Sequence, residues 1–411
     1  MMAAFYSGAK RTTAVMSERP AVWTSRLTTP GAGAFAILFG IEALGRALVT
    51  TALPLQTYAL MGSDEGVSML FLIGSVAAIA MAFVVPRLVL LLGRARVVTL
   101  GILLVAGAAG LFTFQELPSQ VLAFMLRACG VAILYAGLSL FIMDHIRRRE
   151  LGRSEPLRML SVGLGWTVGP AAGVQLEVLW GPDAPFLASA LAAAVLLGYF
   201  WLLRFRRLPI VRPNPDRRVA PPLRHIAQFI AQPRLVLAFL QATGRGMFWA
   251  SFTIYTPLYA VATGLGAQAG GLLVSIGNGF MLLMPLWGWI ARRYGIRRVS
   301  LIAFPLAGLA MTVAGWLAFW PWVGAIAAIC AAGAMSMADG YGNALFFRAC
   351  KPSQRTAMTP IFSAQRDVAS IGHAGLFAIL LSFFPIQAVY ITLGLVLFAM
   401  TLLATRINRR L

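Results

Sequence analysis

Long apolar runs alternate with short clusters of polar and charged residues along almost the whole chain. Each run holds about 20 residues, the length that an α-helix needs to cross a bilayer at about 1.5 Å per residue. The runs lie near residues 33–59, 67–91, 97–115, 119–143, 159–181, 185–204, 235–262, 268–291, 298–319, 321–347, 357–384 and 386–405. This pattern predicts an all-α polytopic membrane protein with twelve transmembrane helices.

The composition supports this prediction and excludes a soluble protein. Of 411 residues, 59% are hydrophobic and 11% are charged, whereas soluble domains hold about 45–50% apolar and about 25% charged residues. A formal net charge of +21 would suggest a nucleic-acid partner in a soluble chain. In a membrane protein, its meaning depends on where the basic residues lie relative to the spans.

The basic residues fall on one side of the predicted spans. With a cytoplasmic N-terminus, 30 of the 34 Lys and Arg residues lie in tails, linker and inner loops, and the outer loops hold none. Because cytoplasmic loops are enriched in Lys and Arg, we expect a multi-pass protein of the cytoplasmic (inner) membrane with both termini inside. The charge therefore reports topology, and the expected partner is the lipid bilayer and no nucleic acid.

An Arg- and Pro-rich stretch divides the chain into two halves of six spans. The first 30 residues lack the apolar core of a signal peptide. Leu223, Ile226, Phe229 and Ile230 fall at helical spacing and favour a short interfacial helix in the linker; an irregular linker is the alternative. The predicted parts are a cytoplasmic N-terminal tail (1–30), an N-terminal six-helix bundle (31–204), a cytoplasmic linker (205–233), a C-terminal six-helix bundle (234–406) and a cytoplasmic tail (407–411).

The two halves resemble each other in sequence. Gly45-Arg46 lies about a third of the way into the first span and Gly244-Arg245 lies equivalently in the seventh, each followed by a Pro and a Tyr. Parallel six-span repeats, related by an axis normal to the membrane, place a substrate site between the halves near the midplane. We therefore expect two pseudo-symmetric six-helix bundles with a site between them.

The loop after the eighth span resembles the inner-loop motif of the major facilitator superfamily, G-x-L-A-D-R-x-G-R-R. It reads Gly288-Trp-Ile-Ala-Arg292-Arg293-Tyr-Gly295-Ile-Arg297-Arg298, and the equivalent loop of the first half keeps Gly93-Arg94-Ala-Arg96. The acidic residue of the motif is absent from both halves, where Leu90 and Arg292 stand instead. Since that residue stabilises the outward-facing state in the family, the resemblance implies that this lock is weakened or built differently here.

Two further patterns are similar to motifs of the same superfamily. The fourth span holds Arg127 with Gly130 three positions later, and the fifth span holds Gly169-Pro170-Ala-Ala-Gly173, similar to a motif of proton-coupled exporters. The resemblance implies the major facilitator fold and transport by alternating access. It also implies conformational or gating roles for Gly93, Arg94, Gly169, Pro170, Gly173, Gly288, Arg293 and Gly295. Because glycine lets transmembrane backbones approach closely, the fifth-span glycines would form a rocking contact between the halves, or would only pack helices.

Ionisable residues within the spans are the candidates for substrate contact and proton coupling, because a charge at membrane depth costs about 2.5–3.5 kcal/mol. Glu42 and Arg46 are one helical turn apart and can pair; the pair either carries a proton or only makes the arginine tolerable in the span. The resemblance assigns Arg127 to proton coupling and substrate contact, with helix bracing as the alternative. The full set is Glu42, Arg46, Arg127, Arg245, Asp339, Arg366, Asp367 and His373.

The second half leaves several partners open. Asp339 is expected to pair with Arg245 or Arg366 across helices, which would be a purely structural role. Neighbours on a helix point about 100° apart, so at most one of Arg366 and Asp367 faces a cavity squarely. His373 is either a proton relay or a histidine with a backbone partner. The four arginines outnumber the three carboxylates, which favours an anionic or zwitterionic substrate.

These features together indicate a secondary active transporter of a small organic solute, working by proton-coupled efflux. An uncoupled facilitator and a proton symporter for a small organic anion are the near alternatives; a polytopic membrane enzyme or a transporter-like scaffold protein is the alternative of another class. The thirteen carboxylates are spread singly, and no Gly-Lys-Ser/Thr phosphate loop occurs. We therefore expect no metal, no cofactor and no enzymatic activity, and a monomer.

Overall fold

The computed structural model describes residues 32–145, 148–205, 223–351 and 354–407. Every regular element in these ranges is a helix. The predicted N-terminal tail (1–30), most of the linker (205–233) and nearly all of the C-terminal tail (407–411) lie outside the described residues. The predicted domain boundaries there stay predictions.

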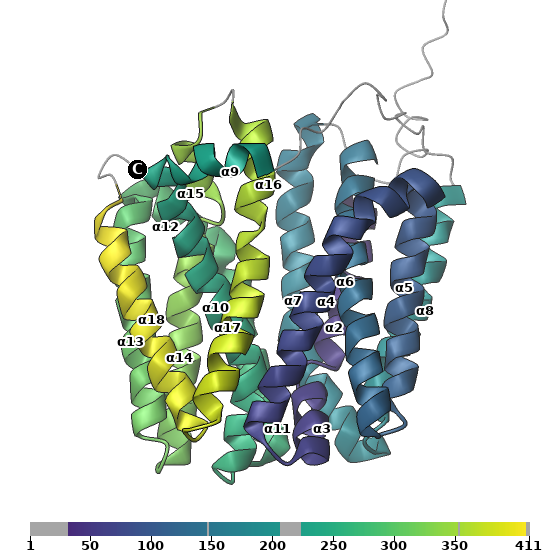
Figure 1. Cartoon of the computed structure of the whole chain (residues 1–411), viewed down its shortest axis with the longest axis vertical. Coiled ribbons are helices and arrows are strands. Elements are labelled where there is room, and N and C mark those ends of the chain that lie inside the picture. Colours follow the sequence, from purple (N-terminus) through teal and green to yellow (C-terminus); the bar gives the residue numbers. More distant parts are fainter. Residues whose placement is uncertain (1–31, 146–147, 206–222, 352–353, 408–411) are drawn as a thin grey trace, which may run out of the picture.

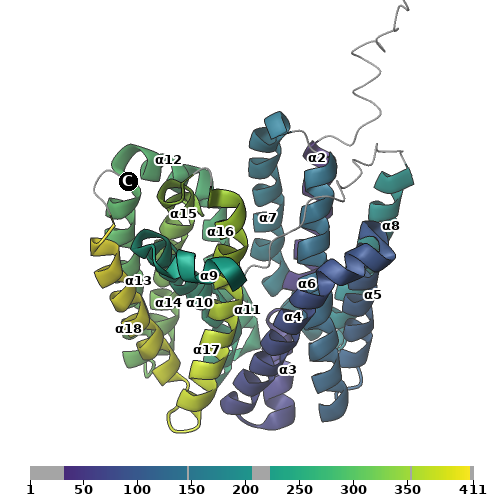
Figure 2. The same cartoon turned by 45° about the horizontal axis from the view of Figure 1, so that its top comes forward.

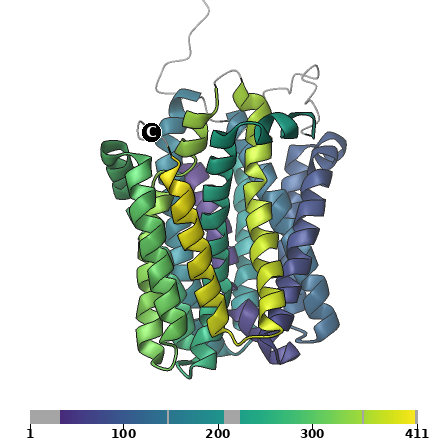
Figure 3. The same cartoon turned by 60° about the vertical axis from the view of Figure 1, so that its left-hand side comes forward.

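The helices of the two halves gather on opposite sides of the molecule (Figure 1). The first half forms α2 (Ala32–Leu48), α3 (Ala52–Met61), α4 (Asp64–Leu92), α5 (Arg94–Phe112), α6 (Leu117–His145), α7 (Arg148–Trp180) and α8 (Ala184–Phe205). The second half forms α9 (Leu223–Ile230), α10 (Pro233–Ala262), α11 (Gly266–Gly279), the 3-10 helix η1 (Phe280–Leu283), α12 (Met284–Tyr294), α13 (Ile296–Trp316), α14 (Pro321–Asp339), α15 (Ala344–Ala349), α16 (Arg355–Ser363), α17 (Gln365–Leu381) and α18 (Gln387–Thr405). Figure 3 shows the long helices running between the same two levels, as in a membrane slab.

The all-helical membrane fold is confirmed, whereas the number of twelve spans is not. Nine helical segments of the described residues are long and apolar enough to cross a bilayer. The remaining long segments are α7, α10 and the pair α16–α17, which lie where spans were predicted. These segments fall short of a spanning helix in hydropathy or in length. The mean hydropathy of α7 is lowered by its glycines and that of α10 by its hydroxyl and amide side chains, and α17 has only 17 residues.

Several predicted spans are broken next to the charged candidates. The breaks separate α2 from α3, α14 from α15 and α16 from α17. Arg46 lies two residues before the end of α2, Asp339 is the last residue of α14, and Arg366 is the second residue of α17. A break frees backbone carbonyls and amides, which must find partners inside the protein because lipid offers none. The breaks thus create polar backbone where the charged side chains lie.

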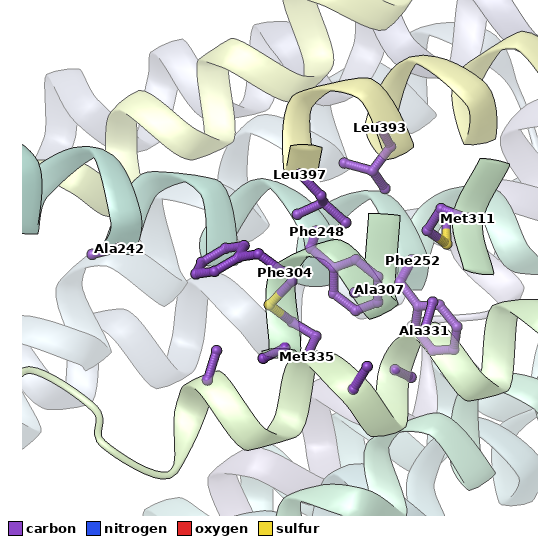
Figure 4. Packing of buried hydrophobic residues seen from close by; sticks show 14 of the residues in the cluster. Ala242, Phe248, Phe252, Phe304, Ala307, Met311, Ala331, Met335, Leu393 and Leu397 are labelled. Atoms are coloured by element: carbon purple, nitrogen blue, oxygen red, sulfur yellow. The ribbon is translucent and has the colours of Figure 1, made fainter. Parts of the chain in front are cut away.

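The largest apolar core lies within the second half (Figure 4). Phe248 and Phe252 of α10 stack with ring centroids 5.8 Å apart, and Phe304 of α13 and Met335 of α14 pack against them. Lipid tails are as apolar as these side chains, so close van der Waals contact, and not transfer from water, holds such a bundle together. The many buried alanines of α13 and α14 allow that close approach.

The same glycine turn occurs in both halves. Gly93 joins α4 to α5 with φ 81° and ψ 155°, and Gly295 joins α12 to α13 with φ 89° and ψ 145°. This backbone region is almost restricted to glycine, because a Cβ would clash with the adjacent peptide. The two inner-loop glycines therefore have a shared structural reason, independent of any gating role.

A short helix, α9, occurs in the segment where an interfacial helix was predicted. Phe229 of α9 is buried, with its ring centroid 6.1 Å from that of Phe239 in α10, while Ile230 is exposed. The position of α9 on a membrane face stays a prediction.

The most extensive contacts between the halves are those of α7 with α11 and η1 and those of α4 with α17. In addition, α3 packs against α10. The Ala171 amide donates to Ser275 Oγ at 2.8 Å, and the Oγ atoms of Ser75 and Ser370 lie 2.8 Å apart. Ser75 and Ser275 lie in the halves of their predicted spans nearer the α3 end, the predicted outer side, and Ala171 and Ser370 lie at the middle of theirs. Figure 2 shows the halves spreading apart toward the opposite end, which carries α12 and α16.

Candidate substrate and proton site between the halves

Glu42 and Arg46 form the ion pair that their spacing predicted. Arg46 Nε lies 2.7 Å from Glu42 Oε1, and Arg46 Nη2 donates to Glu42 Oε2 at 3.0 Å. Such a two-point contact fixes the planar guanidinium on the carboxylate. Glu42 is buried, and the guanidinium of Arg46, which is half-buried, lies 5.6 Å from the centroid of the Trp166 ring on α7.

Arg127 of α6 supports the break between α2 and α3. Its Nη2 donates at 3.4 Å to the backbone carbonyl of Arg46, which also accepts from Thr50 Oγ1 at 3.1 Å. The amide of Thr50 bonds instead to the carbonyl of Ala47, so the Arg46 carbonyl lacks its helical partner. A cation at the carbonyl end of a helix is favourable, which gives Arg127 the bracing role considered as its alternative. Only one of its five N–H donors is used this way.

A small cavity of about 20 Å³ lies beside this pair, inside the first bundle. Glu42, Arg46 and Ser189 line it together with apolar residues of α5 and α6. A volume of at least about 10–15 Å³ accommodates one water molecule when polar partners are present. Glu42 therefore faces the interior of its own bundle as well as the region of Arg127.

Arg245 and Asp339 form the equivalent cluster of the second half. Arg245 Nη1 lies 3.5 Å from Asp339 Oδ1 and donates to the carbonyl of Ala338 at 2.9 Å. Trp249 Nε1 donates to the other carboxylate oxygen, and the Tyr341 ring lies 5.3 Å from the guanidinium. Of the two partners open to Asp339, it takes Arg245. The Arg245 guanidinium thus donates to a backbone carbonyl at the C-terminal end of α14, as the Arg127 guanidinium does at the C-terminal end of α2.

Arg366 and Asp367 are neighbours in α17 but differ in exposure and in their contacts. The guanidinium of Arg366 is 4.2 Å from the centroid of the Tyr135 ring on α6, a contact from one half to the other. Arg366 is exposed and Asp367 is half-buried, and no carboxylate of the described residues lies at ion-pair distance from Arg366. Of the two neighbours, Arg366 is the one that contacts the other half.

His373 lies apart from the charged groups. Its Nδ1 is 3.0 Å from the carbonyl of Ala369, and its side chain is buried while Nε2 has no partner. Ala369, His373 and Phe377 share one face of α17, and Phe377 packs on Tyr255 of α10. The structure thus gives His373 the backbone partner that was its alternative to a proton relay.

A comparison with known families decides what kind of protein this arrangement belongs to. A model described as the Major Facilitator Superfamily matches residues 35–372. The chain belongs to the Major Facilitator Superfamily. Within the superfamily it is a multi-pass membrane transporter and not an enzyme. No curated protein matches the chain in sequence.

Solved structures of superfamily transporters share its fold. A POT family transporter in complex with a thioalcohol-conjugated peptide has a TM-score of 0.72 and 14% identity, over 92% of this chain and 97% of its own. A POT family transporter in complex with 5-aminolevulinic acid has a TM-score of 0.70 and 14% identity, over 92% and 97%. The nucleoside transporter NupG has a TM-score of 0.67 and 13% identity, over 90% and 98%. At these identities the likeness shows the fold alone.

Gly169 and Gly173 of the superfamily motif pack within one bundle, which is the helix-packing alternative considered for them, and their gating role stays a prediction. A Cβ on Gly169 would lie 2.3 Å from the Ala47 Cβ, and a Cβ on Gly173 would lie 1.8 Å from the Leu48 carbonyl oxygen, both on α2. The contact with the other half comes from the opposite face of α7, where the Pro170 carbonyl lies against Gly271 of α11. Successive turns of a helix place residues four apart on one face, so this whole glycine row faces α2.

The inner-loop residues of the superfamily motif lie around the helix ends. Gly288 of α12 packs on Gly340 in the break after Asp339, where a Cβ would lie 3.0 Å from the Gly340 carbonyl oxygen. The Arg293 guanidinium is 5.5 Å from the Trp289 ring centroid, and Arg94 begins α5. Leu90, in the place of the missing aspartate, is 86% exposed. Their gating roles stay predictions.

Sequence reasoning missed Tyr135 and the serines that bond the halves. Tyr135 lies eight residues after Arg127, two helical turns along one face, and that spacing was the available signal. Nothing local marked Ser75 or Ser370, since a serine within a span commonly bonds to its own helix. Among the described residues, no three His, Cys, Asp or Glu side chains come together as a metal site, and the three cysteines are free.

Proposed function

We propose that this protein is a proton-coupled transporter of a small organic solute, and that it exports this solute from the cytoplasm. The observation that carries the proposal is the buried Glu42–Arg46 pair, with Arg127 bonded to the same turn of α2, at the middle of the first span. A carboxylate held by a movable cation takes up a proton when the cation leaves, because a buried charge without a partner is costly. The pair therefore has the chemistry of a proton carrier.

We further propose that the described state is open toward the cytoplasm. Ser68 Oγ lies 2.7 Å from Tyr255 Oη toward the α3 end. The hydrogen bonds that Ser75 and Ser275 make with the opposite half lie between there and the middle of the spans. The basic loops support a cytoplasmic assignment of the other end, in an inner-membrane protein with both termini inside. Opening to the outside would then require these hydroxyl contacts to separate. A monomer is sufficient, since both bundles belong to one chain.

Export is the direction that the fifth-span Gly-Pro pattern supports, because it resembles the motif of proton-coupled exporters. The surplus of arginine favours a second candidate, symport of a proton with a small organic anion. An anion that draws Arg46 away would favour a proton on Glu42, and by linkage the proton would favour the anion. The two candidates differ in the direction in which proton and solute move.

The test uses inverted membrane vesicles that are acid inside and a pH-sensitive dye. Pools of organic anions, sugars and amphiphilic compounds are added in turn to vesicles with the wild-type protein, the Glu42→Gln variant or the Glu116→Gln variant. Glu116 is the matched control, because it is an exposed carboxylate in a predicted outer loop. We expect one pool to collapse the gradient with wild type and Glu116→Gln, and none with Glu42→Gln.

The outcomes separate the candidates. Antiport export dissipates the acid interior as solute enters the inverted vesicle, whereas symport moves protons and solute outward together when solute is loaded inside. A solute flux that persists without proton movement, or that is unchanged in Glu42→Gln, would contradict proton coupling through this pair.

A further inference from the structure

Two cations between the halves have no carboxylate at ion-pair distance. The carboxylate of Glu42 is engaged by Arg46 and that of Asp339 by Arg245. Arg127 donates to a carbonyl and Arg366 lies on an aromatic ring, and neither has an ion pair among the described residues. Guanidinium groups stay charged under all conditions relevant to proteins. A charge at membrane depth calls for a counter-charge, and the carboxylates near these two arginines, Glu42 and Asp367, supply it only in part because Glu42 is already paired with Arg46.

These cations belong to one neighbourhood. Arg127 and Tyr135 lie on one face of α6, separated by about 12 Å along the helix, and Arg366 of the other half lies over Tyr135. Arg46 lies near enough to Arg127 and Arg366 to repel both, while Glu42 attracts Arg127 and Asp367 attracts Arg366. Guanidiniums from α2, α6 and α17 thus lie along the stretch of α6 between Arg127 and Tyr135, with cations contributed by both halves.

The charge balance of this neighbourhood is +1. Arg46, Arg127 and Arg366 contribute three positive charges, and Glu42 and Asp367 contribute two negative charges. One unit of negative charge on a ligand would balance the cluster, and the unused N–H donors of Arg127 would hold its oxygen atoms. A cationic ligand would add to a charge that is already uncompensated.

Aromatic rings lie beside two of these cations. Tyr135 is 53% exposed and Trp166 is half-buried, and each has a guanidinium over its ring. A planar apolar group can stack on such rings and on guanidinium planes. The site therefore combines oxyanion donors with flat apolar surfaces.

We propose that Arg46, Arg127 and Arg366 form a binding site between the halves for a small organic monoanion whose carboxylate, sulfonate or phosphonate group is attached to an aromatic ring. The inference rests on the proposed function, because it names the substrate class of the same site. Binding contacts both halves at once through Arg127 and Arg366, which is the geometry that couples a substrate to their relative movement.

The probe is benzoate, with benzamide as the neutral analogue of the same shape and benzylamine as the cationic one. Calorimetric titration of the full-length protein in lipid nanodiscs measures each affinity. Benzoate is expected to bind at least about tenfold more tightly than either analogue, because a charge-assisted hydrogen bond discriminates by this much or more. Arg366→Gln and Arg127→Gln are each expected to weaken benzoate by about tenfold or more.

Two further variants keep the result interpretable. Arg366→Lys retains the charge but not the planar fork, so it should recover part of the affinity that Arg366→Gln loses. Arg406→Gln removes an exposed arginine beyond the end of α18 and should bind like wild type. Because Arg127 also braces α2, the exposed Arg366 is the decisive position if Arg127→Gln fails to fold.

The proposal is overturned if benzoate does not bind, if benzamide or benzylamine binds as tightly, or if Arg366→Gln leaves the affinity unchanged. Its failure is distinct from that of the proposed function. Proton-coupled transport of a neutral or cationic solute, with no benzoate binding, would remove the anion site and keep the transporter. Benzoate binding that depends on Arg366, in vesicles that transport no solute, would keep the site and remove the transport function.

Discussion

Replacing Gly173 by alanine should force α7 away from α2. The new Cβ would lie 1.8 Å from the Leu48 carbonyl oxygen, where real contacts stay beyond 3.0 Å, so the helices must separate by about 1 Å. Overpacking of this kind costs about 1–3 kcal/mol, and contact with a backbone atom favours the upper end because no rotamer change relieves it. The higher helix propensity of alanine returns about 1 kcal/mol. We expect a net loss of about 1–2 kcal/mol, or about 5–30-fold in the folding equilibrium.

The assay is equilibrium unfolding of the purified protein in mixed micelles, followed by circular dichroism or by exposure of the free cysteines. Gly107→Ala is the matched control, because Gly107 lies within α5 and a Cβ there meets nothing within 4 Å. It should leave stability unchanged or raise it slightly, since only the propensity gain applies. Equal stability of Gly173→Ala and Gly107→Ala would refute the close contact between α2 and α7.

Two further outcomes are expected. Asp339→Asn should lower stability by about 3–5 kcal/mol in the same unfolding assay, since it leaves Arg245 buried without its counter-charge, and a loss within error of zero would contradict this. Cysteines replacing Ser75 and Ser370, in a chain whose native cysteines are changed to serine, should form a disulfide that stops transport until a reductant is added; undiminished transport by the cross-linked protein would show that these hydroxyls need not separate.

Local sequence determined the features that one helix or one turn can fix. The apolar runs predicted the membrane helices, because a span needs about 20 apolar residues wherever it lies in the fold. The spacing of Glu42 and Arg46 predicted their ion pair, since residues four apart on a helix are neighbours. Gly93 and Gly295 are likewise explained locally, because the backbone conformation of their turns disfavours any side chain. The family resemblance followed from such local patterns as well.

The tertiary structure decided which helix faces each of these residues meet. Asp339 had two possible arginine partners, and only the packing of α10 against α14 selects Arg245. Gly173 was open to a contact between the halves or to helix packing within one bundle, and the rotation of α7 turns it toward α2. Arg366 and Tyr135 are 231 positions apart, and their contact depends on how the two bundles are placed. Helix rotation and bundle placement are set by many weak contacts summed over the whole membrane fold, and no local sequence pattern contains that sum.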